Sequence, residues 1–138
     1  MTQLQRTVIN ASTAPQPIGA YSQAVWVNAG ELLFIAGQVA LDSSGNLVGQ
    51  GDVAAQTRQV FHNIGQILDR AGATFHNVAE FTTYLVGRDS IQPFLSARTE
   101  LFPTLFPGGD YPPNTLLIID SLVREESLVE IKAVAALP

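Results

Sequence analysis

Three polar side chains interrupt apolar or aromatic stretches of the sequence, and their types suit acid-base chemistry or ligand binding. Glu130 breaks the apolar alternation of residues 128–134, where a carboxylate can orient a water molecule. The alternative is an exposed strand glutamate that is balanced by Lys132. Tyr21 follows the bend at residues 19–20, and its hydroxyl can hydrogen-bond a ligand, although a half-buried strand tyrosine fits the same pattern.

Arg98 is the third candidate, and it lies one helical step from both Phe94 and Phe102 on the same face of a predicted helix. A cation between two aromatic residues can bind an anionic ligand. Alternatively, the arginine stem covers the rings while the guanidinium contacts Glu100 or solvent. The sequence leaves both interpretations open.

Other kinds of catalytic site are not indicated. The chain has no cysteine, which excludes disulfides and thiolate chemistry, and its two histidines, His62 and His76, do not form a cluster of metal ligands. Residues 49–51 resemble a phosphate-binding loop only superficially, because the further glycines and the lysine of such loops are missing. We therefore expect neither a metal nor a cofactor.

The composition predicts one domain that spans residues 1–138 and associates with further copies of itself. A chain of 138 residues with 46% apolar side chains can bury one core but not two, and a charged content of only 14% leaves apolar surface to cover. The net charge of -5 and the lack of a basic run argue against nucleic acid as a partner. No segment is apolar enough for a membrane span or a secretion signal, so we expect no membrane partner and a cytoplasmic location.

Apolar periodicity and turn signals predict a small α+β domain. Its expected elements, in chain order, are a hairpin of residues 21–27 and 32–35, a helix from Asp52 to Gly72, a strand over 78–86, a helix from Asp89 or Ser90 to Pro103, a loop over 107–113, and strands over 115–123 and 127–135 joined by a charged turn. This order predicts one mixed sheet with both helices packed on a single face. A partner subunit can cover the other face.

Several spaced motifs resemble those of the RidA/YjgF imine-deaminase family, and together they cover nearly the whole chain. They are PQPIGAYSQA at residues 15–24, FIAGQ at 34–38, the helix at 52–72 and LVEIKA at 128–133. The resemblance implies a chorismate-mutase-like homotrimer whose three ligand clefts lie between subunits. It also implies hydrolysis of the enamine or imine products of pyridoxal-phosphate-dependent dehydratases to 2-oxo acids and ammonia.

The resemblance also implies roles for individual residues. Glu130 is expected to position the water, Tyr21 to line the pocket and the backbone amide of Gly37 to bind the ligand, while Ala36 replaces the serine of many members. Asn114 stands where deaminase members carry the arginine that binds the substrate carboxylate. An amide carries no charge, and hydrogen bonds to charged groups contribute about 1.5–3 kcal/mol each, so binding of ordinary imino acids should be weaker.

Arg98 offers a compensation, because the family has a small polar residue at about this helix position near the cleft. Arg98 and Asn114 are then expected to have exchanged roles, with Phe94 beside the cation in the substrate-binding region. The first functional hypothesis is an imine or enamine hydrolase with weak or altered activity. The second is a non-catalytic trimer that binds small metabolites, such as carboxylates, or proteins. An endoribonuclease is the third, and the absence of basic stripes disfavours it.

Overall fold

The computed structural model describes residues 4–138, which form two α-helices, two short 3-10 helices and six strands. In chain order these are β1 (Gln5–Ile9), β2 (Ala24–Asn28), β3 (Glu31–Gln38), α1 (Val53–Arg70), η1 (Phe75–Asn77), β4 (Val78–Val86), η2 (Arg88–Ser90), α2 (Ile91–Leu105), β5 (Asn114–Ile119) and β6 (Val129–Leu137). The helix, strand, helix, strand, strand order predicted for the second part of the chain is confirmed, and β4 has the predicted bounds. No helix in the described part of the chain is long and apolar enough to cross a membrane.

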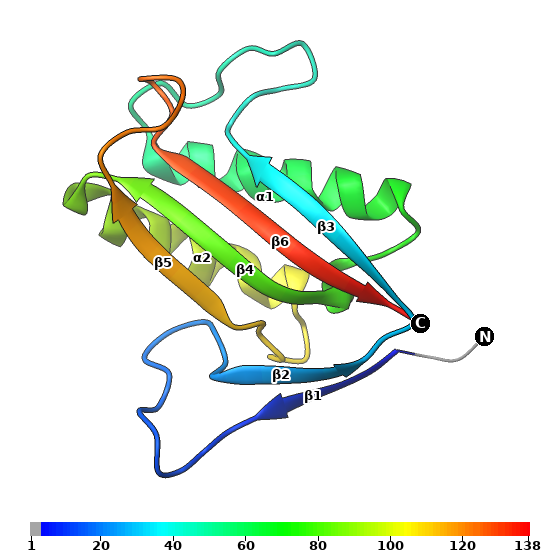
Figure 1. Cartoon of the computed structure of the whole chain (residues 1–138). Coiled ribbons are helices and arrows are strands. Elements are labelled where there is room, and N and C mark those ends of the chain that lie inside the picture. The colour runs from blue at the N-terminus through cyan, green and yellow to red at the C-terminus, as the bar shows by residue number, and fades with distance from the viewer. Residues whose placement is uncertain (1–3) are drawn as a thin grey trace.

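Four strands form one mixed sheet in the order β3-β6-β4-β5. β6 pairs antiparallel with both β3 and β4, whereas β4 and β5 are parallel. Figure 1 shows both α-helices on the same face of this sheet. The predicted α+β architecture, a mixed sheet with two helices on one face, is therefore confirmed.

The core lies between the sheet and the helices, because alternate strand residues point toward the helices. On β6, Val129, Ile131 and Ala133 are almost fully buried, and Phe81 and Leu85 of β4 are buried beside them. Aromatic rings in tilted and edge-to-face contacts fill much of the remaining space. They belong to Phe61, Phe75, Phe81, Phe102, Phe106 and Tyr111.

The ends of α1 follow local signals in the sequence. The Asp52 carboxylate accepts a hydrogen bond from the Ala55 amide at 3.0 Å, which satisfies a backbone donor of the first turn. Gly72 lies just beyond the helix with a positive φ of 74°. Both predicted ends of this helix are confirmed.

The ends of α2 differ slightly from the prediction. Ser90 stands at the start of the helix, but its hydroxyl donates to the Val86 carbonyl at 2.6 Å instead of capping the first turn. The helix passes through Pro103 and ends at Leu105. A proline in the last turn removes only one backbone donor, so the residues after it can still complete the turn.

The predicted hairpin of residues 21–27 with 32–35 is wrong. β2 pairs instead with β1, in a two-stranded sheet below the main sheet in Figure 1, and β3 pairs with β6. The connection at Gly30 packs on the chain end. Its amide donates to the Leu137 carbonyl at 2.9 Å, and a Cβ at Gly30 would lie 2.8 Å from the carbonyl carbon of Pro138. The pairing of β3 with the distant β6 therefore replaces the expected pairing of β3 with β2.

The last two strands, β5 and β6, are neighbours in the sequence but not in the sheet, because β4 lies between them. The predicted strand 115–123 extends too far, since β5 ends at Ile119. The buried Gln56 of α1 holds the connection between them. Its Nε2 donates to the Glu126 carbonyl at 3.0 Å, and its Oε1 accepts from the Leu128 amide at 2.8 Å. This side chain fixes the point at which β6 begins.

Candidate functional site

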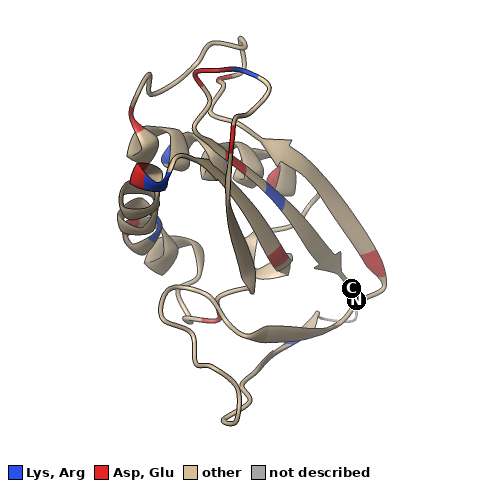
Figure 2. Ribbon diagram, turned by 60° about the vertical axis from the view of Figure 1, so that its left-hand side comes forward, with Lys and Arg blue, Asp and Glu red and all other residues tan. Residues whose placement is uncertain are grey.

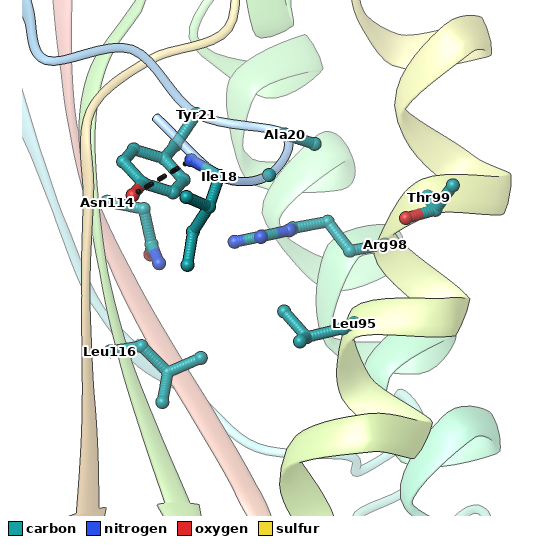
Figure 3. A pocket seen from close by; sticks show the side chains of 9 residues that line it. Ile18, Ala20, Tyr21, Leu95, Arg98, Thr99, Asn114 and Leu116 are labelled. Carbon is teal, nitrogen blue, oxygen red and sulfur yellow. Dashed lines mark hydrogen bonds between the residues drawn. The ribbon is translucent and has the colours of Figure 1, made fainter. Parts of the chain in front are cut away.

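A pocket of about 460 Å³ opens between α2, β5 and the loop that leads into β2. Figure 3 shows side chains from these three segments around one space. The lining residues are Ile18, Gly19, Ala20, Tyr21, Leu95, Arg98, Thr99, Asn114 and Leu116. The structure thus brings together three residues that the sequence singles out: Tyr21, Arg98 and Asn114.

Arg98 extends from α2 into this pocket, with its guanidinium directed toward the loop that carries Ile18 (Figure 3). The residue is only 4% exposed, and its Nε is buried without a hydrogen-bond partner among residues 4–138. The guanidinium carbon lies 5.3 Å from the ring centroid of Phe94 and 5.9 Å from that of Phe102, so cation–π contacts support it. Burial lowers the pKa of Arg98, and the nearby Tyr21 opposes this shift. An arginine nevertheless stays protonated in a protein, so a cation faces the pocket.

Asn114 begins β5 and lies on the helix side of the sheet, beside β4. Its Oδ1 accepts a hydrogen bond from the hydroxyl of the buried Thr83 at 2.8 Å. Because the oxygen is engaged in this way, the Nδ2 group is left to donate into the pocket. The side chain is therefore oriented as a hydrogen-bond donor.

The loop over residues 18–21 places Tyr21 beside the cation. The Tyr21 amide donates to the Gly19 carbonyl at 2.9 Å, and the Tyr21 hydroxyl accepts from the Ile18 amide at 3.4 Å. The proton of the hydroxyl remains available to a ligand. Gly19 lies close to the guanidinium, since a Cβ there would be 3.2 Å from Nη2 of Arg98.

The chemistry of the pocket suits an anion. A guanidinium, a carboxamide NH₂ and a phenol hydroxyl supply donors, and no acidic side chain is among the lining residues, all of which lie in the described part of the chain. Most of the remaining wall is apolar, including Leu95 and Leu116. Such a weakly polar wall strengthens the attraction between the guanidinium and a carboxylate.

Glu130 lies outside this pocket. It projects from β6 to the sheet face that the helices leave open, since its neighbours Val129 and Ile131 are buried on the helix side. Its carboxylate packs against Gly37 of β3, where an added Cβ would overlap it. Glu130 and Gly37 therefore form a second group of predicted site residues, which we call the Glu130–Gly37 group.

The remaining predicted residues belong to one or the other group. Ala36 precedes Gly37 in the exposed stretch of β3 where the register against β6 changes. Phe94 is fully buried beneath Arg98, so it supports the cation and does not line the pocket. We call the pocket lined by Tyr21, Arg98 and Asn114 the donor pocket. Within one chain, the donor pocket and the Glu130–Gly37 group lie on opposite faces of the sheet.

Sequence reasoning missed the apolar half of the pocket and the residue that orients Asn114. Leu95 and Leu116 fit the apolar periodicity of a helix and a strand, which predicts ordinary core positions for both. Their spacing from Arg98 and Asn114 was the available signal, because residues three apart on a helix or two apart on a strand share a face. Thr83 has no such signal, since it lies within a strand rich in β-branched residues.

Charged side chains are few and dispersed in the described part of the chain. Figure 2 shows short basic segments separated along the ribbon and interspersed with acidic ones. The sequence holds 7 Lys and Arg against 12 Asp and Glu. Residues 4–138 contain no group of three or more His, Asp and Glu side chains that could hold a metal ion. Residues 4–138 therefore do not present the positive stripe that follows a phosphate backbone.

Comparisons with known proteins extend over nearly the whole chain. A sequence model of the family described as Endoribonuclease L-PSP matches residues 11–137. A RutC family protein of Pyrococcus horikoshii is 36% identical over 130 residues, which cover 94% of this chain and 97% of that protein. The 2-iminobutanoate/2-iminopropanoate deaminase of Mus musculus is 38% identical over 136 residues, or 98% of this chain and 94% of that protein. The solved structure of YyfB from Yersinia pestis, of the conserved Rid protein family, has a TM-score of 0.84 and 35% identity over 96% of this chain and 98% of that one.

Proposed function

The chain belongs to the Endoribonuclease L-PSP family, also known as the RidA/YjgF family, and we propose that it is an imine deaminase, which hydrolyses 2-imino acids and their enamine tautomers to 2-oxo acids and ammonia. The observation that carries this proposal is the convergence of Arg98, Asn114 and Tyr21 as donors in one pocket. The 38% identity to the mouse 2-iminobutanoate/2-iminopropanoate deaminase supports the same class of reaction.

Arg98 is the proposed anchor for the substrate carboxylate. Asn114 occupies the position at which a deaminase arginine is expected, and Arg98 reaches the same pocket from the neighbouring helix. Together they offer a charged group and a neutral donor, so the carboxylate can be held from two sides. No acidic side chain lines the pocket, all of whose residues lie within 4–138, so the charge of Arg98 is not already paired there and can bind a carboxylate.

Hydrolysis of the imine needs water and proton transfers but neither an oxidant nor a reductant. The water oxygen bonds to the imine carbon, the C=N bond becomes a single bond, and the nitrogen takes up a proton. The carbinolamine then releases ammonia as the C–N bond breaks and the C=O bond forms. Glu130 is the proposed acceptor that holds the water and passes its proton toward the nitrogen. Tyr21 donates a hydrogen bond to the bound substrate or the water.

The complete site is proposed to form between the subunits of a homotrimer. Glu130 lies on the open face of the sheet, which also carries Phe34, 74% exposed, and Leu117, 44% exposed. Large apolar side chains on an open face are typical of an interface. A second copy on this face can bring its donor pocket to Glu130 and to the backbone amide of Gly37. This head-to-tail contact closes into a ring when repeated.

A coupled assay tests the function. A pyridoxal-phosphate-dependent serine or threonine dehydratase generates the imine, and release of the 2-oxo acid is followed with and without this protein. We expect the wild type to raise the rate above the spontaneous one. Arg98→Ala should raise KM about a hundredfold, because two hydrogen bonds to a charged group are lost.

Two further variants test whether KM depends on the guanidinium of Arg98 and not on a general disturbance of the fold. Arg98→Lys keeps the charge but not the planar fork, so its KM should lie between those of the wild type and Arg98→Ala. Arg124→Ala removes an exposed arginine from the loop before β6 and should behave as the wild type. No acceleration by the wild-type protein would contradict the deaminase proposal.

A non-catalytic metabolite-binding protein is the second candidate, and the position of Glu130 outside the donor pocket favours it. In that case 2-oxo acids would bind through Arg98 while imine hydrolysis stays at the spontaneous rate. The endoribonuclease activity in the family's description has less support, because the dispersed basic residues cannot follow a polynucleotide.

A further inference from the structure

We propose that the donor pocket selects 2-imino acids whose side chain is apolar and has four or more carbons, such as those formed from leucine or phenylalanine. This inference rests on the proposed function and names its substrate class. It follows from how polar and apolar residues are arranged along α2 and β5. Smaller imines with a methyl or ethyl side chain are the disfavoured substrates.

The pocket has two layers. Arg98 and Asn114 face each other in the polar layer, and Leu95 and Leu116 face each other in the apolar layer beneath it (Figure 3). Leu95 precedes Arg98 by three residues, roughly 4.5 Å along a helix axis. Leu116 follows Asn114 by two residues, roughly 6–7 Å along a strand. A ligand held by its carboxylate in the polar layer therefore reaches the apolar layer only with a side chain of several carbons.

The size of the pocket leads to the same class of ligand. Its volume of about 460 Å³ lies within the range of about 300–1,000 Å³ that is typical of sites for small molecules. A substrate with a methyl side chain would leave most of this space to solvent or empty. A branched aliphatic or aromatic side chain would contact both leucines and remove their surface from water.

The apolar layer also disfavours polar and charged side chains. Leu95 and Leu116 offer no hydrogen-bond partner, and the single charged residue of the lining, Arg98, is engaged by the carboxylate. Ile18 adds an apolar rim, because its side chain is 96% exposed at the edge of the pocket.

Competition between imines tests the proposal. An L-amino-acid oxidase generates the imines of alanine, leucine and phenylalanine in the presence of this protein, and the rate of hydrolysis gives kcat/KM for each. The imines from leucine and phenylalanine should have kcat/KM at least about tenfold above that from alanine, because one methylene in an apolar pocket already changes specificity by about this factor. Equal or faster hydrolysis of the alanine imine would overturn the proposal.

A polar substitution in the apolar layer tests whether this layer causes the preference for large apolar side chains. Leu95→Asn should bring the ratio of kcat/KM for the leucine and alanine imines close to one. Val123→Asn, a change at a fully exposed side chain in the loop between β5 and β6, should keep the wild-type ratio. An unchanged ratio in Leu95→Asn would show that the selectivity does not come from this layer.

Binding of stable 2-oxo acids tests the proposed ligand class independently of whether the protein hydrolyses imines. In a calorimetric titration, 4-methyl-2-oxopentanoate should bind at least about tenfold more tightly than pyruvate. If this order holds but no imine is hydrolysed, the deaminase proposal fails and the ligand class stands. If pyruvate binds as tightly, or if neither acid binds, the ligand class is wrong.

Discussion

The donor pocket and the Glu130–Gly37 group differ in how the chain builds them. The donor pocket is formed by three segments on the helix side of the sheet, and its polar atoms are oriented by buried neighbours such as Thr83 and Phe94. The Glu130–Gly37 group is formed by two neighbouring strands and lies on the open face. One chain therefore holds the hydrogen-bond donors of the pocket and the carboxylate of Glu130 on opposite sides of a sheet.

Under the proposed function, binding therefore depends on the fold of one chain, whereas catalysis depends on the assembly of several. The donor pocket is formed within one chain, so under the proposed function a single chain carries all the donors that bind the carboxylate. Under the proposed function, hydrolysis requires Glu130 as well, and the sheet keeps that residue away from the pocket of its own chain. Association of subunits is then part of the catalytic mechanism and not only of stability.

Substitution of Glu130 should separate the two regions most strongly. Glu130→Gln removes the proton acceptor but keeps the size of the side chain, so kcat should fall by about 100- to 10,000-fold. The affinity for 4-methyl-2-oxopentanoate should stay within about twofold, because the carboxylate is bound elsewhere. The coupled assay and calorimetry measure these two quantities.

Glu80→Gln is the matched control, because Glu80 is an exposed glutamate on the open face of β4. It should retain the wild-type kcat. If Glu130→Gln weakened 2-oxo acid binding as much as it slowed hydrolysis, the two regions would not have separate roles.

Substitution of Thr83 should have a smaller effect, confined to the donor pocket. Thr83→Val removes the hydroxyl that holds the Asn114 carboxamide, so Asn114 can turn its oxygen toward the ligand carboxylate. Loss of one oriented hydrogen bond to a charged group predicts about a tenfold rise in KM, with kcat nearly unchanged. Thr83→Ser retains the hydroxyl and should restore the wild-type KM. Equal KM values for the valine variant and the wild type would show that Thr83 does not orient Asn114.

The parts of the fold that the sequence predicted have signals within a few residues of each other. Asp52 and Gly72 mark the ends of α1 because capping is a local interaction, and the β-branched run of β4 needs no knowledge of its neighbours. The hairpin was predicted wrongly because residues 28–31 look like a turn, whereas the actual pairing of β3 with β6 joins segments about a hundred residues apart, as Phe34 and Val134 illustrate. Local turn chemistry cannot reveal such a partner.

The candidate site was predictable to a similar degree. Arg98 can be identified from the sequence because it is a cation between aromatic residues, and Asn114 can be identified because it departs from a family pattern. Leu95 and Leu116 cannot be identified as site residues in this way, because apolar residues in a periodic pattern predict core packing. The separation of Glu130 from the donor pocket could not be predicted, since it depends on which sheet face each strand residue occupies once the strand order is known.

The most direct test of the account mixes subunits of two inactive variants. Arg98→Ala keeps Glu130 but lacks the cation, and Glu130→Gln keeps the donor pocket but lacks the proton acceptor. If the site combines the two regions from neighbouring subunits of a trimer, random reassociation of equal amounts should recover about a quarter of the wild-type activity, because each mixed trimer has one site with both intact halves. If each chain used its own Glu130, or if the regions did not cooperate, the mixture would be no more active than the average of the two variants alone.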